Sequence, residues 1–193
     1  MTLQLPSARP RLSEPELIAR LWPLGLTPED KLFVVGIRGY YRDTMGAAGR
    51  NDRGIYDDAI FIVARGLHFS SYNGNTDPSR YRNGQGKGAG KGMASLKPGL
   101  WRAHKFGLHK GQYPALIQTG GTVTVIRDGT PPYEDSGWFG INIHKGGYNR
   151  TSSEGCQTIH PGQWPAFMAN MDDLSRRLGL RAKVIPYALL VDG

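Results

Sequence analysis

One cysteine and a histidine twelve residues before it have the types and spacing of a thiol nucleophile and its base. Cys156 is the only cysteine of the 193-residue chain, and His144 ends an apolar segment upstream of it. A free thiol is little ionised at neutral pH, so a nearby imidazole must take its proton or pair with the thiolate. Polar and turn-forming residues surround Cys156, which disfavours its burial as a small hydrophobic core residue.

The three residues before the cysteine are expected to shape the site of the reacting carbonyl. Gly155 permits a tight turn and a close approach of substrate to the backbone. Backbone N–H groups around Cys156 could then bind a developing oxyanion. We therefore assign Gly155, Ser153 and Glu154 to oxyanion binding and orientation, with Cys156 and His144 as the catalytic pair.

Residues 139–160 resemble the catalytic motif of the L,D-transpeptidase family of peptidoglycan enzymes. That motif is a His, a variable stretch, then Ser/Thr-His-Gly-Cys, an apolar residue and Arg or Asn. His144, Ser153, Gly155 and Cys156 match it. The resemblance implies Cys156 as nucleophile, His144 as base, peptidoglycan stem peptides as substrate, and a β-rich fold with a helix and then a strand after the cysteine.

The chain also departs from this motif. The spacing between His144 and Cys156 is short, Glu154 replaces the second His, and Gln157-Thr158 follow the cysteine. Short, divergent versions resemble those of bacterial toxins and of phage proteins that attack the wall. A carboxylate at position 154 could orient a water, so we expect hydrolysis of stem peptides. The alternative is an L,D-transpeptidase that forms cross-links or exchanges D-amino acids. His160 is expected at the surface.

Charge is concentrated in one segment of the chain. The net charge is +8, yet residues 78–127 contain no Asp or Glu. They carry nine bases: Arg80, Arg82, Lys87, Lys91, Lys97, Arg102, Lys105, Lys110 and Arg127. Such a segment predicts a surface that attracts anions, such as carboxylate-bearing stem peptides or an anionic cell envelope. Within and beside it, the expected substrate-binding residues are Lys87, Lys91, Arg102 and Trp138.

Two other classes of function remain open. In a chymotrypsin-like viral cysteine peptidase, His68 would precede Cys156 in the required order, but no clear acidic partner is found. In a non-enzymatic module that binds nucleic acid, bases would alternate with aromatic residues, as they do at 80–82 and 101–105; we consider nucleic acid an unlikely partner. The glycine-rich segment 84–92 fails the phosphate-loop pattern and predicts a flexible basic loop or lid.

No cofactor and no metal site are predicted. His104 and His109 are five residues apart, a spacing that suits neither one helix face nor one strand face. A single cysteine excludes an internal disulfide. No apolar run reaches about 18 residues, so no membrane span is expected. The N-terminus lacks a signal-peptide pattern. We therefore expect synthesis in the cytoplasm and action on the periplasmic cell wall after release or secretion.

The pattern of elements predicts a mainly β (α+β) domain, a sandwich or barrel with one long helix after the cysteine. A capping box at Ser13 and Glu16 begins a short helix, and apolar spacing predicts a helix from Trp164 to Leu178. We divide the chain into a lead-in with a short helix (1–30) and one catalytic domain (31–193). Strands are expected at 31–40, 59–64, 67–72, 99–106, 113–119, 122–127, 138–144 and 184–191, with Gly120-Gly121 as a hairpin turn.

Overall fold

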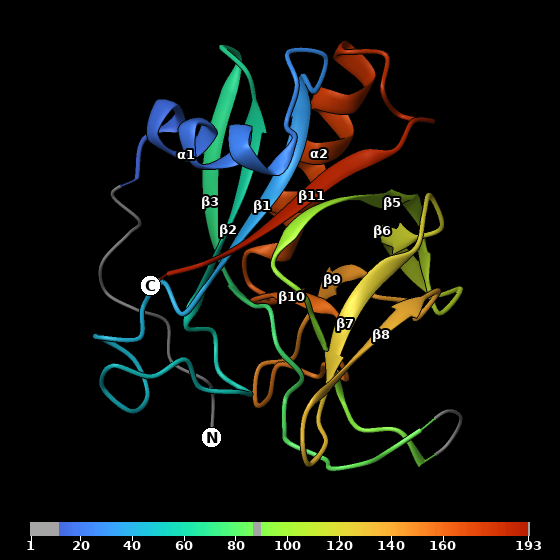
Figure 1. Ribbon diagram of the computed structural model, residues 1–193. Helices are drawn as coiled ribbons and strands as arrows, with labels where there is room; N and C mark the ends of the chain where they lie inside the picture. The colour runs from blue at the N-terminus through green and yellow to red at the C-terminus, as the bar shows by residue number, and fades with distance from the viewer. Residues whose placement is uncertain (1–11, 87–89, 193) are drawn as a thin grey trace.

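Eight strands form a closed barrel, and three more form a small sheet beside it (Figure 1). The computed structural model describes residues 12–86 and 90–192. Around the barrel, the strands are β1 (Leu32–Arg38), β11 (Ile185–Val191), β5 (Gly99–His109), β6 (Tyr113–Gln118), β9 (Ile143–Lys145), β10 (Gln157–Ile159), β3 (His68–Asn75) and β2 (Asp58–Ala64). The small sheet has the order β4 (Ala94–Leu96), β7 (Val123–Arg127), β8 (Tyr133–Gly137). The mainly β class is confirmed.

Both predicted helices form. Helix α1 (Glu14–Leu21) begins with the expected capping box, in which the Ser13 N–H donates to the Glu16 carboxylate at 2.8 Å, and a short 3-10 helix (Trp22–Leu24) follows. Helix α2 (Trp164–Arg177) lies between β10 and β11 in the chain. None of the described helices is long and apolar enough to cross a membrane.

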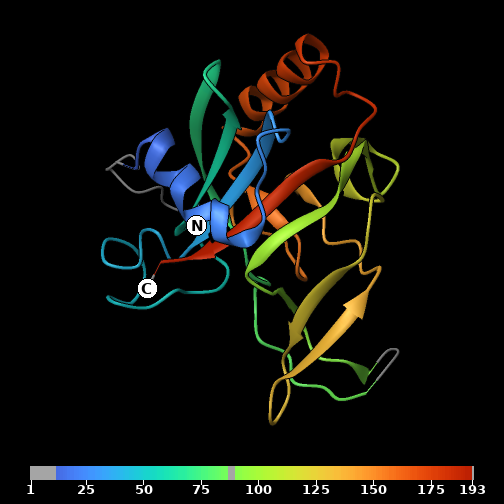
Figure 2. The ribbon, with the colours of Figure 1, turned by 45° about the horizontal axis from the view of Figure 1, so that its top comes forward.

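Strands β1 and β2 are buried on both faces because a helix packs near each face (Figure 2). Side chains alternate along a strand, so Phe33 and Val35 join a cluster with Leu17 of α1. Val34 joins the other cluster, to which α2 contributes Phe167 among its buried residues. This explains why β1 and β2 are almost continuously apolar rather than alternating.

The predicted hairpin at Gly120-Gly121 is wrong. Strand β6 pairs with β5 and β9, whereas β7 pairs with β4 and β8, so the two glycines carry the chain from the barrel to the small sheet. They are needed because the chain passes close to β5. A Cβ at Gly120 would lie 3.2 Å from the Ala103 carbonyl oxygen, and one at Gly121 would lie 2.8 Å from that of Arg102.

The strand predicted at 138–144 is also largely wrong. Only its end lies in a strand, β9, and residues 138–142 are irregular. Their backbone is held by a side chain instead of a strand: Gln118 Oε1 accepts from the N–H groups of Phe139 (3.1 Å) and Ile141 (2.9 Å). Gly140, with φ +68°, turns the chain within this segment.

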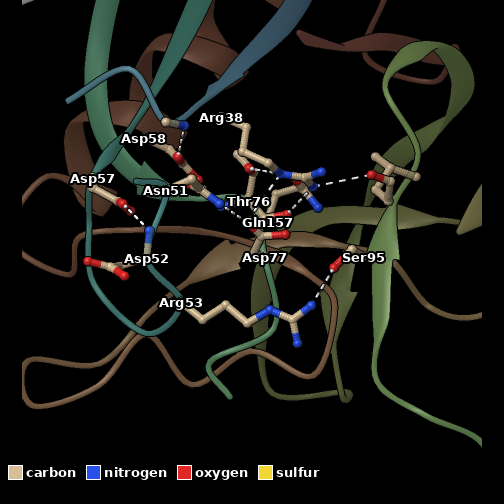
Figure 3. Close-up of polar contacts among 12 residues, drawn as sticks. Arg38, Asn51, Asp52, Arg53, Asp57, Asp58, Thr76, Asp77, Ser95 and Gln157 are labelled. Atoms are coloured by element: carbon tan, nitrogen blue, oxygen red, sulfur yellow. Dashed lines mark hydrogen bonds and ion pairs between the residues drawn. The ribbon is translucent and has the colours of Figure 1, made fainter. Parts of the chain in front are cut away.

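A buried polar cluster ties the loop 42–56 to the barrel (Figure 3). Arg38 lies 3.2 Å from Asp77, which also accepts a hydrogen bond from Asn51 of that loop. Asp58, fully buried, accepts from the Gly39 N–H at 2.6 Å and from a further backbone N–H. The loop is therefore anchored by polar contacts at the ends of β1 and β3.

Candidate active site

A cleft of about 600 Å³ opens beside Cys156. Its walls come mainly from the segment before β4, the end of β5 with the turn after it, the irregular segment 138–142, and the residues leading into β10, with single residues added by β7 and β9. The lining side chains are Arg82, Lys91, Met93, Ala94, His109, Lys110, Arg127, Trp138, Phe139, Ile141, Asn142, His144, Ser152, Glu154 and Cys156, with Gly92, Gly140 and Gly155. The cleft is thus polar, with more cations than anions in its walls.

Parallel pairing of β9 and β10 brings the predicted pair into this cleft. Gln157 lies opposite Ile143 and Thr158 opposite His144, so Cys156 lies beside Asn142. The Asn142 N–H donates to the Cys156 sulfur at 3.4 Å. His144 is two residues beyond Asn142 and shares its strand face. The short spacing in the sequence is therefore the length of one connection between neighbouring parallel strands.

The thiol and the imidazole are both neutral in the resting protein. Burial raises the pKa of the Cys156 thiol to about 11, and the sulfur donates to the Gly140 carbonyl at 3.1 Å. Burial and, to a smaller extent, the neighbouring His109 together lower the pKa of His144 to about 4. The arrangement suits transfer of a proton during attack rather than a standing thiolate–imidazolium pair.

The tautomer of His144 follows from its hydrogen bonds. Its Nδ1 lies 2.8 Å from the carbonyl oxygen of Lys145, an acceptor only, so Nδ1 carries the hydrogen. The Tyr113 hydroxyl lies 3.3 Å from the same nitrogen. This leaves Nε2 as the basic nitrogen of His144.

His109 also belongs to this site, which the sequence analysis did not predict. Its ring stacks on that of His144, with centroids 4.0 Å apart, and its Nδ1 lies 3.1 Å from the Asn142 side-chain amide. Asn142 therefore contacts both His109 and the cysteine sulfur. The spacing of Asn142 and His144 can be seen in the sequence, but it carries no information on His109, which belongs to another strand, β5.

The three residues before Cys156 hold its turn in place. Gly155 has φ +144°, and a Cβ there would collide with the carbonyl oxygen of Ala94. The Ser153 hydroxyl donates to the Cys156 carbonyl at 2.7 Å and accepts from the Gly155 N–H at 3.0 Å, so that N–H already has an acceptor. Glu154 is exposed in the cleft wall.

A buried glutamine continues this anchoring into the barrel. Gln157 stands where the resemblance implied an apolar residue, yet it is fully buried. Its amide donates to the Gly155 carbonyl at 3.2 Å, and its oxygen accepts from the Tyr187 hydroxyl at 2.8 Å. The turn that carries Cys156 is thereby linked to β11.

Of the four predicted substrate-binding residues, two line the cleft. Lys91 and Trp138 do so, and Trp138 is 60% exposed. Arg102 is not among the lining residues: its guanidinium binds both carboxylate oxygens of Asp30, at 2.5 and 2.7 Å. The structure therefore does not bring Arg102 to the cleft, because a carboxylate just before β1 holds it. Lys87 lies outside the described residues.

Acids from outside segment 78–127 bind several of its bases. Asp135 lies 2.8 Å from Arg127 and 3.6 Å from Lys91, and Glu134 pairs with Lys97. The positive surface expected from the segment alone is accordingly smaller. This neutralisation comes from β8, whose pairing with β7 the sequence did not reveal.

The described part of the glycine-rich loop is anchored through Asp128. Asp128 accepts two hydrogen bonds from the Arg53 guanidinium, at 2.6 and 2.7 Å, and one from the Arg82 N–H at 3.1 Å. The Gly84 N–H donates to the Asp128 carbonyl at 3.1 Å. Residues 87–89, at the centre of the predicted lid, lie outside the described residues.

The other histidines have separate environments. His160 is buried rather than at the surface as expected, and its ring meets Tyr56 edge-on. His68 lies at the start of β3, 2.7 Å from the Ser70 hydroxyl, and does not line the cleft. His104 is fully buried, 2.8 Å from the Ile141 carbonyl. Within residues 12–86 and 90–192, no group of three or more His, Cys, Asp or Glu is placed to hold a metal ion.

No protein-family model, no curated protein and no solved structure matches this chain. The geometry defines the class of site, a single thiol beside paired imidazoles in a basic cleft, and function must be argued from that site.

Proposed function

We propose that the protein is a cysteine acyl-transfer enzyme that acts on peptide substrates, with peptidoglycan stem peptides as the substrate class. One observation carries the proposal: the chain's single thiol and the imidazole of His144, from the adjacent parallel strand, line the same cleft. The peptidoglycan assignment rests on the resemblance of His144, Ser153, Gly155 and Cys156 to the L,D-transpeptidase motif.

The first half-reaction forms a thioester. The Cys156 sulfur attacks the scissile carbonyl carbon while its proton passes to Nε2 of His144. The tetrahedral intermediate then collapses, the C–N bond breaks, and the leaving amine takes the proton from His144. The Lys145 carbonyl keeps the imidazolium oriented, because it accepts the Nδ1 hydrogen in both protonation states.

We propose hydrolysis for the second half-reaction. Water attacks the thioester carbonyl, gives a proton to His144, and releases a carboxylic acid as the thiol is restored. The exposed Glu154 supports this choice, since a carboxylate in the cleft wall can accept a hydrogen bond from the attacking water. It also repels an acceptor that brings its own carboxylate.

The surroundings of the thiol fit a carboxylate-bearing peptide. Arg82 and Lys110 add positive charge to the walls, and the exposed Trp138 offers an apolar face. Action on the periplasmic wall after release or secretion from the cytoplasm follows from this substrate. Nucleic acid is less well supported, because Asp135, Glu134 and Asp30 bind bases that a phosphate backbone would need.

Incubation with purified sacculi and defined muropeptides tests the proposal, with products identified by mass spectrometry. Shortened peptides and a thioester adduct of one protein mass plus one acyl group are expected, and Cys156→Ala should give neither. Dimeric products, or exchange of an added D-amino acid, would instead show that the same thioester is resolved by an amine. Equal product formation by Cys156→Ala would reject the mechanism.

A further inference from the structure

The turn between β5 and β6 carries a residue that turn chemistry alone does not favour. The Gln112 N–H donates to the His109 carbonyl at 3.0 Å and closes the turn. Both central residues have positive φ, +50° at Lys110 and +71° at Gly111, as in a type I′ turn. Asn, Asp and Gly suit the first of these positions, whereas lysine is strained there. A lysine at this point is therefore not explained by the backbone.

This lysine faces the reacting groups. Lys110 lines the cleft together with His109, His144 and Cys156. The thiol pKa is raised mainly by burial, and the Asn142 N–H and then the Lys110 ammonium act in the opposite direction. Lys110 also adds to the effect of burial in lowering the pKa of His109. The positive charge of Lys110 thus acts to lower the pKa values of Cys156, His109 and His144.

Two of the other three cations of the cleft, Lys91 and Arg127, differ from Lys110, whereas the Arg82 side chain, like that of Lys110, has no hydrogen bond or ion pair with the residues that the structure describes. Unlike Lys110, Arg82 does not contribute to the pKa shifts of Cys156, His109 or His144. Lys91 and Arg127 share the carboxylate of Asp135. For Lys110, no hydrogen bond or ion pair of the side chain is found with residues 12–86 or 90–192. Backbone strain is also concentrated at the cleft. Among the described residues, the two non-glycine residues with positive φ are Lys110 and Ser152, and both line the cleft.

We propose that Lys110 is the specificity-determining residue of the cleft, and that its ammonium binds a carboxylate carried by the acyl donor close to the carbonyl that Cys156 attacks. The inference rests on the proposed function and narrows its substrate class to peptides with a free carboxylate next to the scissile bond. A peptide with a neutral carboxamide at that position would lack the ionic interaction with the Lys110 ammonium.

Alkylation of the single cysteine tests the charge without any substrate. Iodoacetate and iodoacetamide both form an S–C bond with the thiolate and release iodide, but only iodoacetate is an anion. Lys110→Asn suits the turn and should fold at least as stably as the wild type. It should lower the ratio of the iodoacetate rate to the iodoacetamide rate about fivefold, the effect of one nearby unit charge at a partly exposed site.

Two variants control this measurement. Lys110→Arg keeps the charge and should keep the ratio. Lys105→Asn removes a cation of β5, the strand before this turn, that does not line the cleft, so it should leave the ratio unchanged. An equal ratio in the wild type and in Lys110→Asn would overturn the assignment of Lys110 as an anion site.

Peptide pairs that differ only in carboxylate and carboxamide test the substrate class. The wild type should show a lower KM for the carboxylate peptide than for the carboxamide peptide, and Lys110→Asn should lose that preference. Turnover of both peptides without preference would overturn the inference while the proposed function stands. If neither peptide is turned over and the alkylation ratio still depends on Lys110, the proposed function fails and the anion site remains.

Discussion

The imidazole rings of His109 and His144 lie nearly parallel, 20° apart, with their centroids separated by 4.0 Å. They belong to β5 and β9, two strands that are separated in the barrel by β6. Stacked imidazoles tolerate one proton far better than two, because two positive charges at this separation repel each other. His109 therefore helps to keep His144 neutral and fixes the plane of its ring.

Replacing His109 by phenylalanine separates these two effects. His109→Phe keeps an aromatic ring against His144 and removes the ionisable partner, so the pKa of His144 should rise. The acidic limb of the pH–activity profile, along which His144 becomes protonated, should then move to higher pH. NMR titration of the His144 ring checks the shift directly. His144→Ala should lose about 10²–10⁴-fold in kcat, and an unmoved profile in His109→Phe would contradict the proposed coupling.

Loss of the thiol should remove activity without loss of the fold. Cys156→Ala deletes a sulfur that lies in the cleft wall and makes two weak hydrogen bonds, at 3.1 and 3.4 Å. We expect no detectable thioester or product and a change in the free energy of unfolding of about 1 kcal/mol or less. Denaturant unfolding and product analysis on the same preparation check both points, with Cys156→Ser as a closer match in size.

The thiol should ionise only at high pH. Its folded pKa is raised to about 11, so the thiolate fraction grows about tenfold per pH unit throughout the neutral range. The rate of alkylation by iodoacetamide should rise with the same slope and level off only in strongly alkaline solution. A rate that is already constant at neutral pH would show a thiolate–imidazolium pair instead.

Adding a single methyl group at Gly155 should distort the nucleophile turn. Gly155→Ala combines a backbone conformation with φ +144° and a collision with the Ala94 carbonyl. We expect a cost of about 1–3 kcal/mol in the free energy of unfolding and a large loss of kcat. Gly66→Ala is the matched control: its φ is +64°, but a Cβ there meets nothing within 4 Å. Equal effects in the two variants would show that the contact with Ala94 is unimportant.

Local patterns in the sequence predicted those helices and strands whose characteristic pattern lies within a single segment of the chain. The capping box at Ser13 and Glu16 predicted α1, and the apolar spacing from Trp164 onward predicted α2, as the structure confirms. Continuous apolar runs predicted β1, β2 and β11. The prediction of Cys156 as a nucleophile likewise rested on a local feature, a lone thiol in a turn, and it stays a prediction.

Short strands and turns that are defined by their contacts with distant segments could not be predicted from local patterns. Strands β4, β9 and β10 have three residues each, and hydrogen bonds to neighbouring strands define them rather than any periodicity. Gly120-Gly121 has the composition of a hairpin turn, yet its role is a close passage over β5 that only the packed structure creates.

The sequence by itself determined which residue is the nucleophile candidate and which histidine precedes it on a strand. Only the tertiary structure decided that His109 stacks on that histidine, that Asp135 binds Arg127 and Lys91, and that Lys110 faces the thiol. These relationships join residues from different strands. Strand register and barrel closure set them, and both depend on the packing of the whole chain rather than on any local segment.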